Sequence, residues 1–192
     1  MASGQERKVF YFDSKGPVNT DKTLDIALAC CKEREIQKIV VASSTGETAL
    51  KLHKTAPAGP DIIAVTYSAG SRFPEEVEQF LENRDEIKAK GITVVRGMHA
   101  LSATEKAFQN KYKTSLMPLN IVADSLRMFC HGVKVCVEIA IMAAEAGHIT
   151  PEQNVVAIAG SHRGADTAVV MKPAYAANMF ETKIKALLCM PS

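Results

Sequence analysis

Three hydroxyl residues and a glycine stand together in the first quarter of the chain and could bind an anion. Ser43, Ser44, Thr45 and Gly46 follow the apolar run IVVA, and a helical pattern that includes Thr48 follows them. The first amides of a helix have no acceptor inside it, and the helix dipole places partial positive charge there. This turn therefore suits a phosphate group. The same hydroxyls could instead merely cap the helix, since the stretch lacks a P-loop lysine and a dinucleotide fingerprint.

Four apolar runs are predicted to be the buried strands that position this turn. They lie at 39–42, 61–66, 92–95 and 154–159, and a weaker, alternating run lies at 8–12. Apolar runs without alternation are typical of parallel strands that are covered on both faces. The helical patterns that would cover them span residues 20–35, 47–53, 74–90, 104–112, 120–130 and 132–147. The sequence therefore predicts one α/β domain over residues 1–192, with a three-layer α/β/α architecture.

A fifth strand is predicted at 167–171, close behind the fourth. Only the loop 160–166 separates the two, which is too short for a crossover helix, so this strand should run antiparallel. The sheet is thus expected to be mostly parallel, with an antiparallel strand near the C-terminus. Ligands of such sheets bind outside the carboxyl ends of the strands. Four loops should meet there and form a pocket, at 43–46, 66–71, 97–101 and 160–166.

Composition and charge exclude several classes of function. A net charge of +2, without a basic block, argues against nucleic-acid binding. The most apolar helical pattern contains Lys134, Glu138 and Glu145, so it should not span a membrane, and the start MASGQERKVFYF has no apolar signal core. Five cysteines without a CxxC pair suggest reduced thiols in a cytoplasmic protein, with no metal site. Glu138 lies at the border of an apolar helix face, where a buried carboxylate would mark a functional position.

Several segments resemble the C-terminal domain of pyruvate kinase. The resemblance runs from Thr23 to Gly97 through IVVASSTGETALKL, DIIAVT and KAKGITVVRG, and resumes from Lys134 with VCVEIAIMAAEAGHITPEQNVVAIAG. In pyruvate kinases the corresponding Thr/Ser-Gly turn holds a phosphate of a sugar bisphosphate effector, which implies phosphate binding at residues 43–48. The 192 residues leave no room for the catalytic barrel of that enzyme, so pyruvate kinase activity is not expected.

A second resemblance is to a small group of stand-alone archaeal and bacterial proteins that share this domain. It rests on YFDSKG, LRMFCHGVKVCVEIA, HRGADTAVVMKPA and FETKIKALLCMP. Members of that group hold flavin mononucleotide (FMN), which implies FMN as the cofactor and a flavin-dependent oxidoreductase of unknown substrate and unknown catalytic residues. Two alternatives stay open: a non-enzymatic sensor of a phosphorylated metabolite, and an assembly module, because the pyruvate kinase domain also makes subunit contacts. As an assembly module, the protein could form a homo-oligomer.

FMN needs a phosphate site, polar contacts for its ribityl chain and a slot for a flat ring, and the sequence offers candidates for each. The turn at 43–48 would hold the phosphate, and the polar contact with the ribityl chain would come from Thr66, Ser161 or Asp166. Methionine packs well on flat rings, so the ring would lie against Met98, His99 and the segment Leu126-Arg127-Met128. A cation near the flavin pyrimidine would come from Arg163, beside Gly164, or from Lys172.

These assignments have structural alternatives. Arg127 and Arg163 could pair with carboxylates such as Glu138 or Asp166, and Asp166 could only fix the turn of its own loop. His99 could be a hydrogen-bonded histidine without a catalytic role. No pair of nucleophile and base stands out by its spacing.

Overall fold

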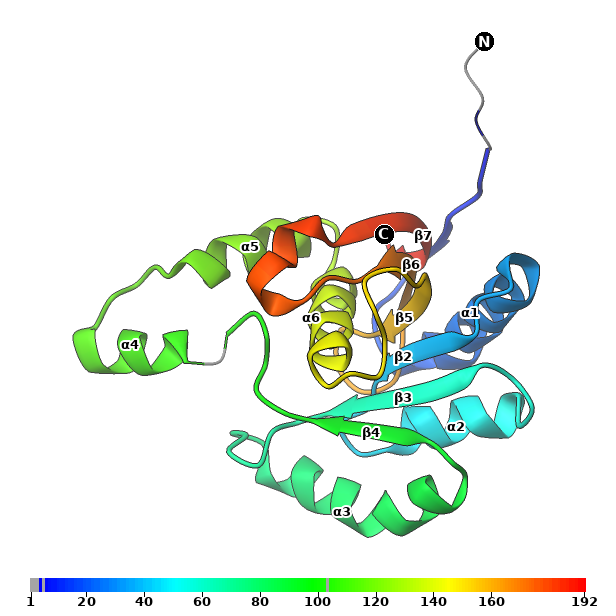
Figure 1. Cartoon of the computed structure of the whole chain (residues 1–192), viewed down its shortest axis with the longest axis horizontal. Coiled ribbons are helices and arrows are strands. Elements are labelled where there is room, and N and C mark those ends of the chain that lie inside the picture. Colours follow the sequence, from blue (N-terminus) through cyan, green and yellow to red (C-terminus); the bar gives the residue numbers. More distant parts are fainter. Residues whose placement is uncertain (1–3, 5, 103) are drawn as a thin grey trace.

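A seven-stranded sheet divides the molecule into two helical layers. The computed structural model describes residues 4, 6–102 and 104–192. The strands are β1 (Phe10–Phe12), β2 (Lys38–Ala42), β3 (Asp61–Thr66), β4 (Thr93–Arg96), β5 (Val155–Ala159), β6 (Thr167–Lys172) and β7 (Lys183–Pro191). Their order across the sheet is β1-β7-β6-β5-β2-β3-β4 (Figure 1). All of the predicted strands are present, and β1 is shorter than the predicted run at 8–12.

The strand directions confirm the predicted sheet. β2 pairs in parallel with both β3 and β5, and β4 pairs in parallel with β3. β6 pairs antiparallel with β5 on one side and with β7 on the other, and β1 lies parallel to β7. Among the described residues β6 is therefore the one strand that runs against all the others. Its direction follows from the short connection to β5, which leaves no room for a crossover.

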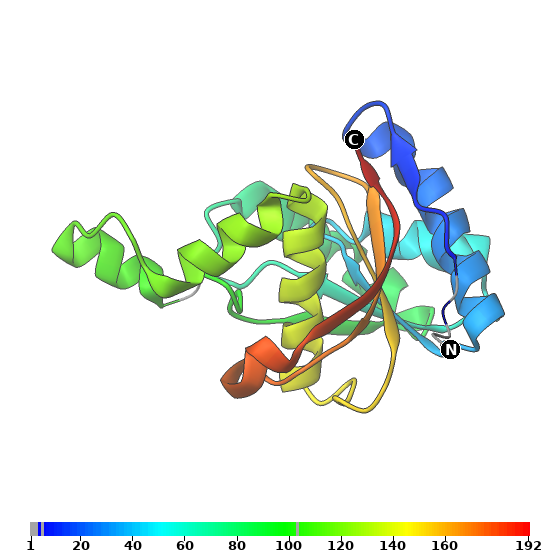
Figure 2. The ribbon, with the colours of Figure 1, turned by 90° about the horizontal axis from the view of Figure 1, so that it is seen from above.

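Helices cover both faces of the sheet, as the view from above shows (Figure 2). They are α1 (Thr20–Arg34), α2 (Glu47–Thr55), α3 (Pro74–Ala89), α4 (Glu105–Tyr112), α5 (Pro118–Arg127) and α6 (His131–Glu145), with short 3-10 helices η1 (Pro17–Asn19) and η2 (Ala176–Glu181). The buried side chains of α1, α2 and α3 pack on one face, and those of α6 pack on the other. α5 lies against α6, whereas α4 projects away from the sheet.

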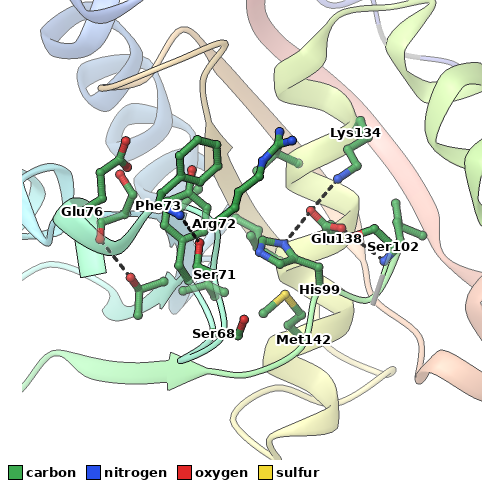
Figure 3. Close-up of a pocket in the computed structure, with 18 of the residues that line it drawn as sticks. Ser68, Ser71, Arg72, Phe73, Glu76, His99, Ser102, Lys134, Glu138 and Met142 are labelled. Carbon is green, nitrogen blue, oxygen red and sulfur yellow. Dashed lines mark hydrogen bonds and ion pairs between the residues drawn. The ribbon is translucent and has the colours of Figure 1, made fainter. Parts of the chain in front are cut away.

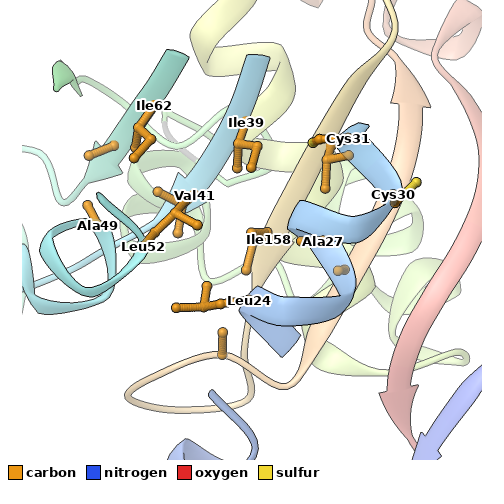
Figure 4. Close-up of a cluster of buried hydrophobic side chains, with 14 of the residues drawn as sticks. Leu24, Ala27, Cys30, Cys31, Ile39, Val41, Ala49, Leu52, Ile62 and Ile158 are labelled. Carbon is orange, nitrogen blue, oxygen red and sulfur yellow. The ribbon is translucent and has the colours of Figure 1, made fainter. Parts of the chain in front are cut away.

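Alternating side chains of the strands belong to two separate hydrophobic cores, one on each face of the sheet. In β2, Ile39 and Val41 pack with Leu24 of α1, whereas Val40 packs with α6 on the opposite face. Figure 4 shows the first core, in which α1 lies over β2 and β5. Full burial of one such side chain contributes roughly 1.5–3 kcal/mol, so these cores hold the helices in place at the sheet. All five cysteines are buried and free.

The joint between α5 and α6 lies a little earlier than predicted. α5 begins at Pro118, because proline fits the first position of a helix, and ends at Arg127, before the residue predicted as its last. Cys130 then caps α6, since its Sγ accepts a hydrogen bond from the Val133 amide at 3.4 Å. α6 is buried along most of its length, yet no helix of the described residues is long and apolar enough to cross a membrane.

Candidate functional site

A cleft of about 1250 Å³ opens at the carboxyl ends of the parallel strands. Its walls are the loops 43–48, 66–73, 98–102 and 160–164, together with residues of α4, α5 and α6. The four loops predicted to meet therefore do so. Figure 3 shows side chains of the loops after β3 and β4 facing those of α6.

The turn between β2 and α2 is held by bonds that leave its amides open. Gly46 has a φ of 91°, and a Cβ there would lie 2.7 Å from Cδ1 of Ile87, so glycine is required. The Ser43 Oγ accepts a hydrogen bond from the Ala49 amide at 3.2 Å and caps α2. The Ser44 carbonyl accepts one from Thr66 Oγ1 at 3.0 Å. These bonds use the Ala49 amide and the Ser44 carbonyl, and other amides of the turn are left for a ligand.

Four amides of this turn have no acceptor within the described part of the chain: those of Ser44, Thr45, Gly46 and Thr48. The hydroxyls of Ser44 and Thr48 also lack a partner there. We call this group of donors the amide turn. Donors clustered at the start of a helix form a site for an oxyanion, because the helix dipole adds positive potential to them.

A buried carboxylate on α6 links three elements of the cleft wall. Glu138, which is 2% exposed, accepts hydrogen bonds from Lys134 Nζ at 2.6 Å, from the Leu101 amide at 3.2 Å and from His99 Nδ1 at 3.3 Å (Figure 3). Burial alone would raise the pKa of Glu138, but the His99 hydrogen bond and the Lys134 ammonium outweigh it and lower the pKa from 4.5 to about 2. The carboxylate is therefore ionised at neutral pH. It is also buried and hydrogen-bonded, as its place on the border of the apolar helix face suggested.

Aromatic side chains line the cleft wall beside this carboxylate. The rings of Tyr67 and Phe73 stack with centroids 5.3 Å apart, and the Tyr67 ring lies 5.8 Å from that of His99. Burial raises the pKa of Tyr67, so its hydroxyl stays protonated. Met98 and Met142 also line the cleft. Together these side chains offer an apolar surface on which a planar ring can lie.

The balance of charge in the cleft favours an anionic ligand. Five lysines and arginines line it against three glutamates: Arg72, Lys106, Arg127, Lys134 and Arg163 against Glu47, Glu76 and Glu138. Burial, with the nearby charges of Lys134 and Arg127, lowers the pKa of His131 in the same wall. Positive potential in a cleft raises the local concentration of anions.

Eleven of the thirteen predicted site residues line the cleft: Ser43, Ser44, Thr45, Thr48, Thr66, Met98, His99, Arg127, Ser161, Arg163 and Gly164. Gly46 belongs to the amide turn through its backbone but is absent from the lining, and so is Asp166. Asp166 is 0% exposed, and its carboxylate binds the Gly16 amide at 2.9 Å, the Ser161 amide at 3.2 Å and the Thr167 hydroxyl at 2.8 Å. Asp166 thus fixes the turn of the loop 160–166 through these hydrogen bonds, which is the structural alternative given above for this residue.

Other candidates around the ring lie differently. Arg127 pairs with Asp124 at 2.6 Å on the same helix, rather than with Glu138 or Asp166. Leu126 packs into the core, Met128 is exposed, and neither lines the cleft. Lys172 cannot contact a ligand there, because it ends the antiparallel strand β6 and so lies at the opposite edge of the sheet.

Two features of the site were missed by sequence reasoning. The first is the Lys134–Glu138 ion pair, whose signal was two opposite charges four residues apart inside an apolar helix. The second is the stack of Tyr67 on Phe73, which no sequence pattern indicated. Among the described residues there is no group of three or more His, Cys, Asp or Glu side chains that could hold a metal ion.

Comparison with known proteins places the chain in a family. A profile of the family described as "Pyruvate kinase, alpha/beta domain" matches residues 21–171. Two solved structures of Cryptosporidium parvum pyruvate kinase are similar. The first has 14% sequence identity and a TM-score of 0.42, and the match covers 84% of this chain. The second, in complex with ADP, has 16% sequence identity and a TM-score of 0.39, and the match covers 82% of this chain. This chain spans 24% of the length of each. Because the profile covers more than half of its length, the chain belongs to the family of the pyruvate kinase alpha/beta domain.

Proposed function

We propose that this protein binds a phosphorylated small molecule, flavin mononucleotide, in the cleft at the carboxyl ends of the strands. The observation that carries the proposal is the amide turn. Its four amides and two hydroxyls have no partner in the described chain and stand at the start of α2. A phosphate with two negative charges would accept hydrogen bonds from several of these donors at once. The turn would then hold the phosphate end of the ligand.

The remaining walls fit the other parts of FMN. The hydroxyl of Ser161 is buried in the cleft wall without a hydrogen-bond partner, and a polyhydroxy chain would satisfy it. The stacked rings of Tyr67 and Phe73 offer a surface for a planar ring system. The resemblance of four segments to stand-alone proteins that hold FMN supports the choice of flavin. When bound, FMN would supply one- and two-electron chemistry, as in a flavin-dependent oxidoreductase.

The direct test is to identify what the protein holds. The protein is purified and denatured, and the released small molecules are analysed by mass spectrometry. FMN is also titrated into the protein, with flavin fluorescence as the readout. We expect a yellow protein that releases FMN or takes it up. A colourless protein that binds no added FMN would contradict the proposal. Thermal stabilisation by sugar phosphates alone would instead support the sensor of a phosphorylated metabolite.

Two substitutions test the place of the phosphate. Ser44→Ala and Thr48→Val each remove a hydroxyl from the amide turn and keep the backbone. Because a hydrogen bond to a charged group contributes about 1.5–3 kcal/mol, each should weaken FMN binding by roughly 10- to 100-fold. Thr55→Val is the matched control, since the Thr55 hydroxyl bonds the Lys51 carbonyl at the other end of α2. Equal affinities in all three variants would place the phosphate elsewhere.

A further inference from the structure

The carboxylate of Glu138 fixes the tautomer of a neutral His99. A carboxylate only accepts hydrogen bonds, and Glu138 Oε2 lies 3.3 Å from His99 Nδ1. The proton of a neutral His99 must therefore sit on Nδ1, which leaves a lone pair on Nε2. Nε2 has no partner in the described part of the chain, and the side chain is 34% exposed in the cleft wall. The geometry thus presents a basic nitrogen to whatever occupies the cleft.

The same carboxylate oxygen also holds a cation. Lys134 Nζ donates to Glu138 Oε2 at 2.6 Å, and it has no other acceptor among the described residues. An ammonium carries three donors, so two remain. Lys134 lines the cleft, and because it shares an oxygen atom with His99, the cation lies close to the base (Figure 3). A base beside a cationic donor is the arrangement that removes a proton next to a carbonyl group.

We propose that the cleft is a proton-transfer centre for phosphorylated hydroxycarbonyl compounds, with His99 as the base, Lys134 as the donor to the carbonyl oxygen and Glu138 as the positioning residue. The proposal rests on the phosphate site of the proposed function, and does not need the rest of that ligand to be a flavin. The phosphate would lie at the amide turn, in the same cleft.

The step transfers one proton and no electrons. The C–H bond next to the carbonyl breaks, and its electron pair forms the C=C bond of an enolate. The π pair of the carbonyl moves onto its oxygen, where the Lys134 ammonium stabilises the charge. The proton goes to His99 Nε2, exchanges with water and returns to the carbon. Glu138 keeps Nδ1 protonated and stabilises the imidazolium, as the carboxylate does in other carboxylate–histidine pairs.

Solvent hydrogen exchange tests this step without knowledge of the product. Dihydroxyacetone phosphate is incubated with the protein in D₂O, as purified and after bound small molecules are removed, and proton NMR follows the loss of its C–H signals. We expect exchange faster than in buffer, slowed by inorganic phosphate. His99→Asn should lower the rate by about 10²-fold or more, the range of general-base catalysis. His53→Asn is the matched control, because His53 lies in the last turn of α2 and outside the cleft.

A second readout isolates the role of Glu138. Nitrogen-15 NMR of the His99 ring should show the Nδ1–H form in the wild-type protein. In Glu138→Gln the Nε2–H form should appear, because an amide can donate as well as accept, and exchange should fall together with it. A purely structural Glu138 would leave the ring proton in place. Circular dichroism confirms that each variant is folded before its rate is compared.

The outcomes separate this inference from the flavin proposal. Exchange that depends on His99 supports the inference, even if the protein binds no FMN. Binding of FMN without exchange of dihydroxyacetone phosphate in either preparation overturns the inference and leaves the flavin proposal intact. Exchange that persists in His99→Asn at the wild-type rate also overturns it, since a contaminating enzyme or another residue would then be responsible.

Discussion

Replacing Glu138 by glutamine should destabilise the protein in a way that depends on pH. Glu138 is buried, and the pKa of its carboxyl is lowered from 4.5 to about 2 by His99 and Lys134. A lowered folded-state pKa contributes stability that is present above the unfolded value of 4.5 and is lost as pH falls through 2. Glutamine does not titrate, so the difference between the two proteins should follow the ionisation of this one carboxyl.

The size of the effect follows from the shift in pKa. Each pKa unit corresponds to about 1.4 kcal/mol, so the shift of Glu138 amounts to about 3 kcal/mol at pH 7. By the same linkage, roughly half of this contribution to the free energy of unfolding remains at pH 3 and almost none below pH 2. A loss of this size agrees with the cost of roughly 3–5 kcal/mol for removing one partner of a buried ion pair, because Lys134 would keep an unpaired ammonium.

Urea unfolding followed by circular dichroism at several pH values from 7 to 3 measures this difference. Glu82→Gln on the exposed face of α3 is the matched control, and its effect should stay within about 0.5 kcal/mol at every pH. A Glu138→Gln difference that is constant from pH 7 to pH 3 would refute the reasoning. It would show that the cost comes from packing, and that the carboxylate is not held ionised by Lys134 and His99.

Three further predictions concern the backbone and the thiols. Gly46→Ala should lower the free energy of unfolding by about 1–3 kcal/mol in urea titrations and abolish FMN binding, because φ is 91° and Ile87 fills the space. Gly132→Ala should cost about 1–3 kcal/mol in the same assay, since a Cβ would overlap the side chain of Thr167. At pH 8 a disulfide reagent should modify the cysteines only after unfolding, because all five are buried, and burial raises the pKa values of Cys30, Cys136, Cys189 and Cys31, that of Cys31 to about 12.

Much of the sheet could be predicted because its signals are local. Buried parallel strands appear as uninterrupted apolar runs, and the short loop before Thr167 decides the direction of β6. The end of α5 was harder to predict. Residues 128–130 are compatible with a helix in sequence, but Cys130 has an extended backbone and caps α6, which separates the two helices. Such a cap is a contact between particular atoms, which periodicity cannot show.

The candidate site shows the same division. The amide turn could be expected from Ser43–Gly46, because hydroxyl residues and glycine at a strand–helix junction suit either an anion site or a helix cap, and Ser43 does cap α2. The roles of Asp166 and Lys172 depended instead on the direction of a side chain and on the direction of a strand. Asp166 faces inward to the amides of Gly16 and Ser161, and Lys172 lies at the far edge because β6 runs antiparallel. A residue type and a loop position do not determine which way a side chain points.

The cluster on α6 illustrates why charges can persist inside an apolar helix. The first turns of α6 lie at the cleft, where Gly132 allows close contact with Thr167 at the start of β6. Lys134 and Glu138 are one turn apart on this part of the helix, so both reach the cleft while their neighbours pack against the sheet.

Burial strengthens the pairing between Lys134 and Glu138, and the pairing offsets the cost of burial only if each polar atom finds a partner. Glu138 has three such partners, whereas two donors of Lys134 and the Nε2 of His99 have none in the described chain. In a cluster that is otherwise satisfied, the groups left open are those that face the cleft, and a ligand with an oxygen acceptor and a transferable proton would complete it.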